Sequence, residues 1–294
     1  MNNRNILYVA GNYFGAQYQC IDYLLHTDFN VRVAAYNIHS HIPEIWWSLD
    51  ALPYPSAKEQ LIQDLTDWKP TLAIIDYDSE MSWICQELNI PIIKCSPLHL
   101  IDGIEKFNFK NYKTLINSTL KCLSKIPYSE YNFIYSPFSF INDLRIKNDY
   151  EWISPYTYGL ETGQDTIAIV NRNVDKISNF VDKITSTKRG SVDYIDDMNN
   201  CHQVLSSGET AVITDAILNG KKLCITPDIK NAENCINAII CQQYNIGRDL
   251  GQIEYLNYLA ADEVTKGWNT TQKLYEPKEA KFLDQRIEEI WKSL

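Results

Sequence analysis

Residues 6–15 read Ile-Leu-Tyr-Val-Ala-Gly-Asn-Tyr-Phe-Gly, and this stretch decides how the first part of the chain folds. Five apolar residues are followed at once by a turn that begins and ends with glycine. A helical pattern then covers residues 16–26, and a second apolar run occupies residues 31–36. Strand, glycine turn, helix and strand in this order predict a βαβ unit.

The same alternation continues along the chain. A helix is expected over residues 56–68, where Ser56 would be the N-cap and Glu59 would complete a capping box. Runs that are apolar on both faces are typical of a parallel sheet that helices cover on both sides. The other expected elements are helices over 80–88, 174–184 and 277–294, and strands over 70–76, 90–95, 165–171, 191–195, 203–206 and 223–226.

The chain of 294 residues is long enough for two domains, and turn residues at 155–163 place the boundary near residue 160. We therefore expect an α/β protein with two Rossmann-like domains, residues 1–159 and 160–294, and a cleft between them. The last helix is expected to pack across a domain surface.

Composition narrows the function. The net charge of −10 argues against non-specific binding to nucleic acid or anionic lipid. Eight cysteines without a C-x-x-C pair favour buried thiols over a zinc site or a disulfide framework, so no metal is expected. No run approaches the ~18 apolar residues of a membrane span, and the first residues lack the anatomy of a signal peptide. These features predict a cytoplasmic protein.

Residues 205–210, Leu-Ser-Ser-Gly-Glu-Thr, lead from a strand that ends in small residues directly into a helix. Backbone N–H groups at a helix N-terminus are unpaired, and together with the helix dipole they favour an anion such as a diphosphate. Asp215 follows about two turns later, and its carboxylate could accept hydrogen bonds from a ribose. An ordinary capped turn with a solvated Asp215 explains the same residues equally well.

Residues 206–238 resemble the nucleotide-sugar domain of GT-B glycosyltransferases, in particular the family-28 group that includes the lipid II N-acetylglucosaminyltransferase. The matching segments are Thr214-Asp215-Ala216, Gly220-Lys221-Lys222, Ile225-Thr226-Pro227 and Glu233-Asn234-Cys235-Ile236-Asn237-Ala238. The resemblance implies a GT-B fold and the transfer of a sugar from a UDP-sugar.

The resemblance also implies residue roles. Asp215 falls on the acidic position that holds the ribose, and Asn234 falls on a glutamine that touches the donor sugar. Residues 192–198 resemble the loop whose backbone contacts the uracil ring. The donor-binding residues implied in this way are Gly11, Gly15, Tyr194, Ile195, Ser206, Ser207, Gly208, Glu209, Thr210, Asp215, Glu233 and Asn234.

Residues 11–16 fall on the first glycine loop of the same family, but Ala16 stands where the family has a histidine. Catalysis must therefore come from another residue, because an inverting transfer needs a base that takes the proton of the acceptor hydroxyl. A helix N-terminus can stabilise the departing diphosphate without a metal. The candidate bases are Asp76, Asp78 and His99, with Asp102 as a further one. Asp76 as a turn cap and His99 as a structural histidine remain open.

Residues 106–128 contain five lysines and no acidic residue, with Phe and Tyr between them. Lys106, Lys110 and Lys113 could neutralise phosphates while the aromatic rings stack on bases, which suits a nucleic acid. A chain rich in Asn, Ile, Tyr and Lys is typical of large phages, so the expected acceptor is a hydroxymethylated pyrimidine in phage DNA, modified in the host cytoplasm. An ordinary helix over 112–126 with its lysines in solvent explains the run as well.

Other readings stay open. The acceptor could be a cell-envelope or lipid-linked saccharide, or a small molecule. The protein could also be a nucleotide-sugar epimerase of the same fold, or a binding module without catalysis.

Overall fold

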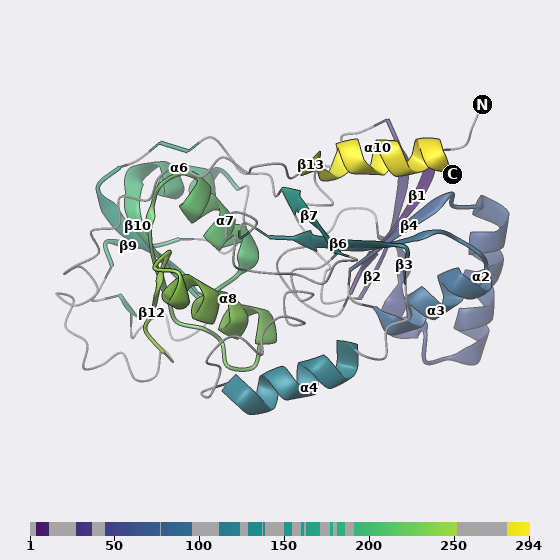
Figure 1. Ribbon diagram of the computed structural model, residues 1–294, viewed down its shortest axis with the longest axis horizontal. Coiled ribbons are helices and arrows are strands. Elements are labelled where there is room, and N and C mark those ends of the chain that lie inside the picture. The colour runs from purple at the N-terminus through teal and green to yellow at the C-terminus, as the bar shows by residue number, and fades with distance from the viewer. Residues whose placement is uncertain are drawn as a thin grey trace.

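The computed structural model describes residues 4–11, 28–36, 45–76, 78–95, 112–123, 129–136, 138, 150–154, 160–161, 163–170, 177–178, 181–185, 191–251 and 281–294. Figure 1 shows two sheets, each with helices beside it. We call the first sheet with helices α2, α3 and α10 the first unit, and the second sheet with α6, α7 and α8 the second unit.

The first sheet has eight parallel strands in the order β13-β7-β6-β5-β4-β1-β2-β3. Every residue of β1 is buried, which explains its unbroken apolar sequence. The strands are β1 (Asn5–Ala10), β2 (Asn30–Ala35), β3 (Ile45–Ser48), β4 (Leu72–Asp76), β5 (Ile92–Cys95), β6 (Tyr131–Tyr135), β7 (Tyr150–Ser154) and β13 (Lys281–Phe282).

Helices cover both faces of this sheet. Leu7 and Val9 share a core with α2 (Pro55–Trp68) and α3 (Ser79–Glu87). The alternate residues of β1, Ile6 and Tyr8, share another core with α10 (Leu283–Ser293). This division follows from the two-residue period of a strand. A short 3-10 helix, η2 (Leu49–Ala51), follows β3.

The second sheet has five parallel strands in the order β12-β11-β10-β8-β9. All three helices of the second unit contribute to a single large core. Residues Thr210–Ile217 of α7 are buried on every side, as expected of a helix that is apolar all round. The elements are β8 (Asp165–Ile169), β9 (Lys183–Ile184), α6 (Val192–Asn200), β10 (Cys201–Ser206), α7 (Thr210–Leu218), β11 (Lys222–Ile225), α8 (Ala232–Gln243) and β12 (Arg248–Asp249).

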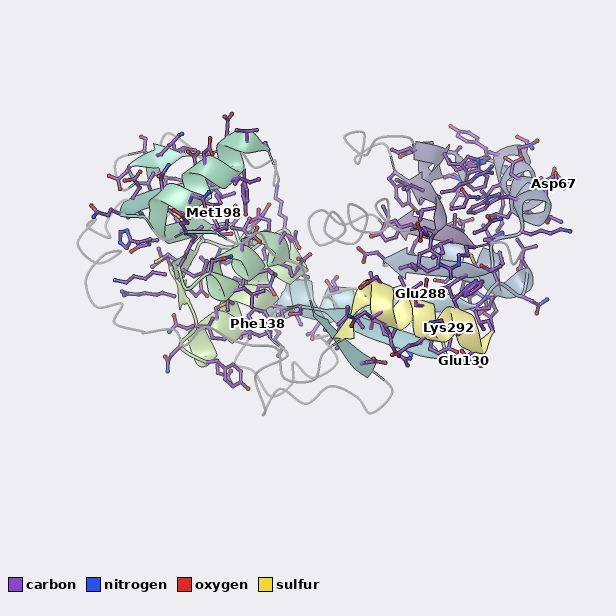
Figure 2. All side chains as sticks on the ribbon, turned by 90° about the horizontal axis from the view of Figure 1, so that it is seen from above. Asp67, Glu130, Phe138, Met198, Glu288 and Lys292 are labelled. Atoms are coloured by element: carbon purple, nitrogen blue, oxygen red, sulfur yellow. The ribbon has the colours of Figure 1, made fainter. Side chains whose placement is uncertain are left out.

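Two segments connect the units in an order that the sequence did not predict. Helix α4 (Lys113–Leu123) lies against α8 (Figure 1), and Ile116 is buried in the core of the second unit. The hydroxyl of Tyr112 donates to Asp249 Oδ2 at 3.2 Å. Figure 2 likewise shows Phe138, which belongs to that core, beside the second unit.

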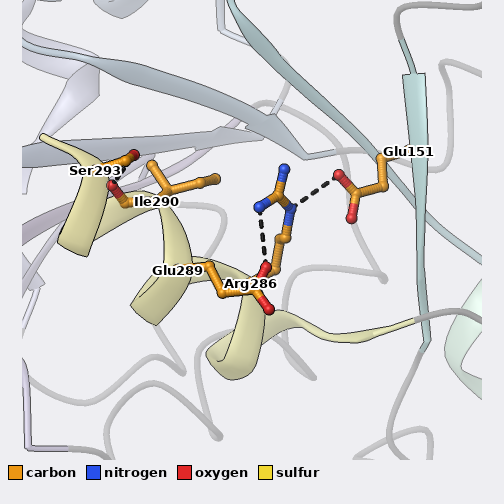
Figure 3. Close-up of polar contacts among 5 residues, drawn as sticks. All are labelled: Glu151, Arg286, Glu289, Ile290 and Ser293. Atoms are coloured by element: carbon orange, nitrogen blue, oxygen red, sulfur yellow. Dashed lines mark hydrogen bonds and ion pairs between the residues drawn. The ribbon is translucent and has the colours of Figure 1, made fainter.

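The C-terminal segment lies on the first unit. β13 pairs with β7, and Leu283, Ile287 and Ile290 pack in the first unit's core. Arg286 of α10 donates from Nε to Glu151 of β7 at 2.9 Å (Figure 3). Residues 281–294 therefore differ from the expectation that assigned them to residues 160–294, whereas the boundary near residue 160 stays a prediction.

Three expectations about single elements are wrong. Residues 191–195 are the start of α6, because the Ser191 hydroxyl caps the helix by accepting from the Tyr194 N–H. Helix α2 begins at Pro55, with no side-chain cap from Ser56 or the expected box. Lys183 and Ile184, expected to end a helix, form β9. The expected helix over 16–26 lies outside the described residues.

Within the described ranges, no helix is both long and apolar enough to cross a membrane. The same ranges contain no group of three or more His, Cys, Asp or Glu residues placed to hold a metal ion.

Candidate functional site

In each sheet the strand order reverses at one point. The reversal lies between β1 and β4 in the first sheet and between β8 and β10 in the second. Ligands of α/β proteins bind outside the carboxyl ends of the strands at such points. Gly11 and Asp76 lie at the first of them, and residues 206–210 lie at the second.

The turn from β10 to α7 depends on Gly208. Its φ of +101° lies in the region that favours glycine, and its N–H donates to Ser206 Oγ at 2.9 Å. A Cβ at this position would lie 2.9 Å from the carbonyl oxygen of Asn234. Both the conformation and the close approach to α8 therefore require glycine.

A hydrogen-bond network joins this turn to the first turns of α8. Asn237 Nδ2 donates to the Gly208 carbonyl and to Thr210 Oγ1, both at 2.9 Å. Thr210 Oγ1 in turn donates to Glu233 Oε1 at 2.5 Å. The N-termini of α7 and α8 thus converge, and two positive helix ends side by side favour an anion.

Carboxylates already occupy part of this place. Glu209 accepts from Ser206 Oγ at 3.0 Å, from the side chain of Ser207 and from its own N–H. These are donors that the sequence assigned to a diphosphate. Burial raises the pKa of Glu209, and burial, reinforced by the charge of Glu209, raises the pKa of Glu233 to about 7.

Two polar atoms beside the network have no hydrogen-bond partner in the described part of the chain. They are Asn234 Oδ1, on the first turn of α8, and Thr226 Oγ1, directly after β11. The Thr226 N–H donates to the carbonyl of Ser206 at 2.8 Å, which fixes Thr226 beside the turn. Buried polar atoms normally find a partner, so these two atoms suit a ligand that supplies one.

Asp215 lies deeper than expected. It is fully buried, and the hydroxyl of Tyr194 donates to its Oδ2 at 2.8 Å. Residues 192–198, expected as a loop at the uracil ring, form helix α6, with Tyr194 buried and Ile195 packed against the same core. A ribose would reach Asp215 only if Tyr194 moved. We therefore assign Asp215 a structural role, and its contact with the ribose stays a prediction.

In the first unit, Asp76 is the last residue of β4 and pairs with Ala10, which places it beside Gly11. Asp78 caps α3: its Oδ1 accepts from the Met81 N–H at 2.7 Å, and its Oδ2 accepts from the Tyr36 hydroxyl at 2.8 Å. Burial raises the pKa of Asp78. The capping role considered for Asp76 thus belongs to Asp78.

The remaining predicted residues divide into two groups. Lys113 is exposed at the start of α4, whose opposite side packs on α8, as the ordinary-helix interpretation requires. Gly15, His99, Lys106 and Lys110 lie outside the described residues.

Sequence reasoning missed the parts of the site that depend on distant contacts. Asn237 belonged to the quoted motif but received no role, although it holds the Gly208 turn. Lys221 is fully buried and donates to the carbonyls of Glu161 and Cys201 at 2.6 and 3.0 Å, so it ties the second unit together away from the turn.

No family model and no curated protein match the chain. Three solved structures are similar to it. The spinosyn forosaminyltransferase SpnP has 13% identity and a TM-score of 0.63, over 98% of this chain and 99% of that one. UGT2 of Phytolacca americana, complexed with UDP-2fluoro-glucose and pterostilbene, has 10% identity and a TM-score of 0.64, over 98% and 99%. The glycosyltransferase SsfS6 of Streptomyces sp. SF2575, complexed with thymidine diphosphate, has 13% identity and a TM-score of 0.55, over 88% and 90%.

At these identities the likeness defines the architecture, and it does not single out the family-28 group. With its two parallel sheets, the chain has the GT-B fold, two Rossmann-like domains, of its glycosyltransferase neighbours.

Proposed function

We propose that this chain is a glycosyltransferase that takes a sugar from a nucleoside diphosphate and passes it to a hydroxyl group. The observation that carries the proposal is the Gly208 turn, where the N-termini of α7 and α8 meet at the point of strand reversal. UDP is the expected nucleotide, in line with the sequence resemblance and with the ligand named for UGT2 of Phytolacca americana.

The chemistry of the donor suits this site. The bond from the anomeric carbon to the diphosphate oxygen breaks, and negative charge grows on the leaving diphosphate. The positive ends of α7 and α8 would stabilise that charge without a metal ion. The unpaired oxygens of Thr226 and Asn234 can accept hydrogen bonds from donor hydroxyl groups.

The base is proposed for the first unit. The acceptor oxygen forms the new bond to the anomeric carbon, and its proton passes to a carboxylate or histidine. Both oxygens of Asp78 already hold α3 and Tyr36, so we favour Asp76 among the described candidates. His99 stays a prediction.

For the acceptor we place a small hydroxyl compound ahead of the hydroxymethylated pyrimidine of phage DNA. Pterostilbene, named in a structure with a TM-score of 0.64, is of this kind. Among the lysines on which the DNA prediction rested, Lys113 alone is described, and α4 has a sufficient structural role in packing on α8.

The test is acceptor-dependent release of UDP or TDP in the presence of EDTA. The chain is incubated with UDP-glucose or TDP-glucose and with pterostilbene, a cell-envelope saccharide or hydroxymethylcytosine DNA, and each acceptor is then weighed by mass spectrometry. An acceptor that gains the mass of one sugar supports the proposal. Change of the donor sugar without an acceptor would instead indicate an epimerase, and nucleotide binding without any reaction would indicate a binding module.

A further inference from the structure

The first unit carries an open pocket of about 450 Å³ at the β3 edge of its sheet. This volume lies within the range of small-ligand sites. Figure 2 shows Asp67, one of its residues, on the outer side of the unit. The pocket is lined by Arg32 of β2, Trp46 of β3 and Asp64, Asp67 and Trp68 of α2.

This pocket is separate from the candidate site. Arg32 pairs in register with Leu7, in the first half of β1, whereas Asp76 pairs with Ala10 at the carboxyl end. The side chain of Asn5 donates to the carbonyl of Trp68 at 2.7 Å, which also places the pocket toward the amino end of the strands.

Arg32 forms the floor of the pocket between two indole rings. Its Cζ lies 4.9 Å from the ring centre of Trp46 and 4.6 Å from that of Trp68. The two rings are 5.4 Å apart and tilted by 49°. In the described part of the chain no hydrogen bond to the guanidinium is found, so the stacked group keeps its N–H donors for a ligand.

Two carboxylates from α2 add acceptors. Asp64 is held by hydrogen bonds from Trp47 Nε1 at 2.9 Å and Gln60 Nε2 at 2.8 Å, and these bonds lower its pKa. Asp67, one turn on, is exposed and accepts from Gln63 at 3.0 Å through Oδ1 alone. The pocket thus offers ionised acceptors and cationic donors side by side.

This combination selects among ligand classes. An anion would meet two carboxylates against one guanidinium. A quaternary ammonium ion needs the space between the rings, and Arg32 occupies that space. A sugar ring has hydroxyl groups that both donate and accept, and its C–H face can pack on an indole.

We propose that this pocket binds a neutral sugar ring of an oligosaccharide, with Trp46 as the packing surface and Arg32 and Asp67 as hydrogen-bond partners of its hydroxyl groups. The site is independent of the donor site. It would hold a glycan chain on the protein whatever reaction the second unit supports.

The test is a titration followed by NMR of the indole N–H groups of the seven tryptophans. The probes are cellotetraose, chitotetraose and maltotetraose, with inorganic phosphate and tetramethylammonium as an anion and a cation. At least one tetrasaccharide should shift the Trp46 and Trp68 signals with a dissociation constant on the order of 1 mM, and Trp83 on α3 should not respond. Saturation with UDP should leave this binding unchanged, so it can be judged even if UDP does not bind.

Two variants separate the pocket from the rest of the chain. Arg32→Lys keeps the charge but loses the planar group, and it should weaken the sugar about tenfold while the signals outside the pocket stay in place. Asp67→Asn, at an exposed position, should weaken it as well. Binding equal to wild type in both variants would overturn the proposal, as would a response to phosphate or tetramethylammonium without one to any sugar.

Discussion

Replacing Glu209 by glutamine should strengthen the binding of UDP. The carboxylate of Glu209 takes the hydrogen bonds of Ser206, of Ser207 and of its own N–H at the turn where we place the diphosphate. A diphosphate must therefore displace this group or share the turn with it. Glutamine keeps an acceptor for the same donors but carries no negative charge.

The size of the effect follows from the geometry. A phosphate that used the donors of the turn would lie about 5 Å from the displaced carboxylate, and two unit charges at that separation repel by ~3 kcal/mol at an effective dielectric constant of 20. Glu209 is partly exposed, so we take 1–3 kcal/mol as the range, which corresponds to about 5-fold to 150-fold in affinity.

The assay is isothermal titration of UDP at pH 8, where Glu209 is charged in the wild type. Glu161→Gln is the matched control, because Glu161 is an exposed residue of the same unit whose hydrogen bonds come from its backbone. The control should bind UDP like the wild type. Equal or weaker binding in Glu209→Gln would refute the placement of the diphosphate at this turn.

Three further predictions concern stability, measured by chemical denaturation. Because burial raises the pKa of Glu233 from 4.5 to about 7, its contribution to stability is complete below pH 4.5 and is lost as the pH rises through 7, a change of ~3 kcal/mol. Glu233→Gln should lose this part of the pH dependence, and a wild type that responds to pH like the variant would contradict the assignment. Tyr194→Phe should lower the free energy of unfolding by about 2 kcal/mol, because Asp215 loses a buried donor, whereas Tyr54→Phe at an exposed position should change it by less than ~0.5 kcal/mol; equal effects would exclude a special role for the Tyr194 hydroxyl. Gly208→Ala should cost more than Gly251→Ala, since both have positive φ but the new Cβ meets Asn234 only at Gly208, and the reverse order would show that the turn yields freely.

Local patterns predicted most of the framework. The unbroken apolar run of residues 6–10 indicated a strand buried on both faces, and β1 is one. The passage from strand to helix at residues 205–210 is confirmed by β10 and α7. Both features depend on neighbours in sequence, which is why they could be read without a structure.

The errors have physical reasons. Val192, Tyr194 and Ile195 favour strands, but the Ser191 cap and the burial of Tyr194 and Met198 on one side make the segment a helix. A two-residue strand such as β13 has no periodicity, so the return of the chain to the first sheet left no signal.

The candidate site shows the same limit. The turn residues were predicted, whereas the bond from Tyr194 to Asp215 and the carboxylate of Glu209 folded into the turn depend on contacts that sequence patterns do not contain. The role of Asp78 as the cap of α3 could have been read locally, because it precedes a helix whose third residue supplies the N–H.

The most direct test of the central claim is the titration of the wild-type chain with UDP and TDP in the presence of EDTA, beside Gly208→Ala and Gly251→Ala. The account predicts saturable binding of at least one nucleotide at a single site, about tenfold weaker in Gly208→Ala and unchanged in Gly251→Ala, because only the first glycine shapes the turn between α7 and α8. Failure of the wild type to bind either nucleotide, or equal binding by the folded Gly208→Ala variant, would contradict it.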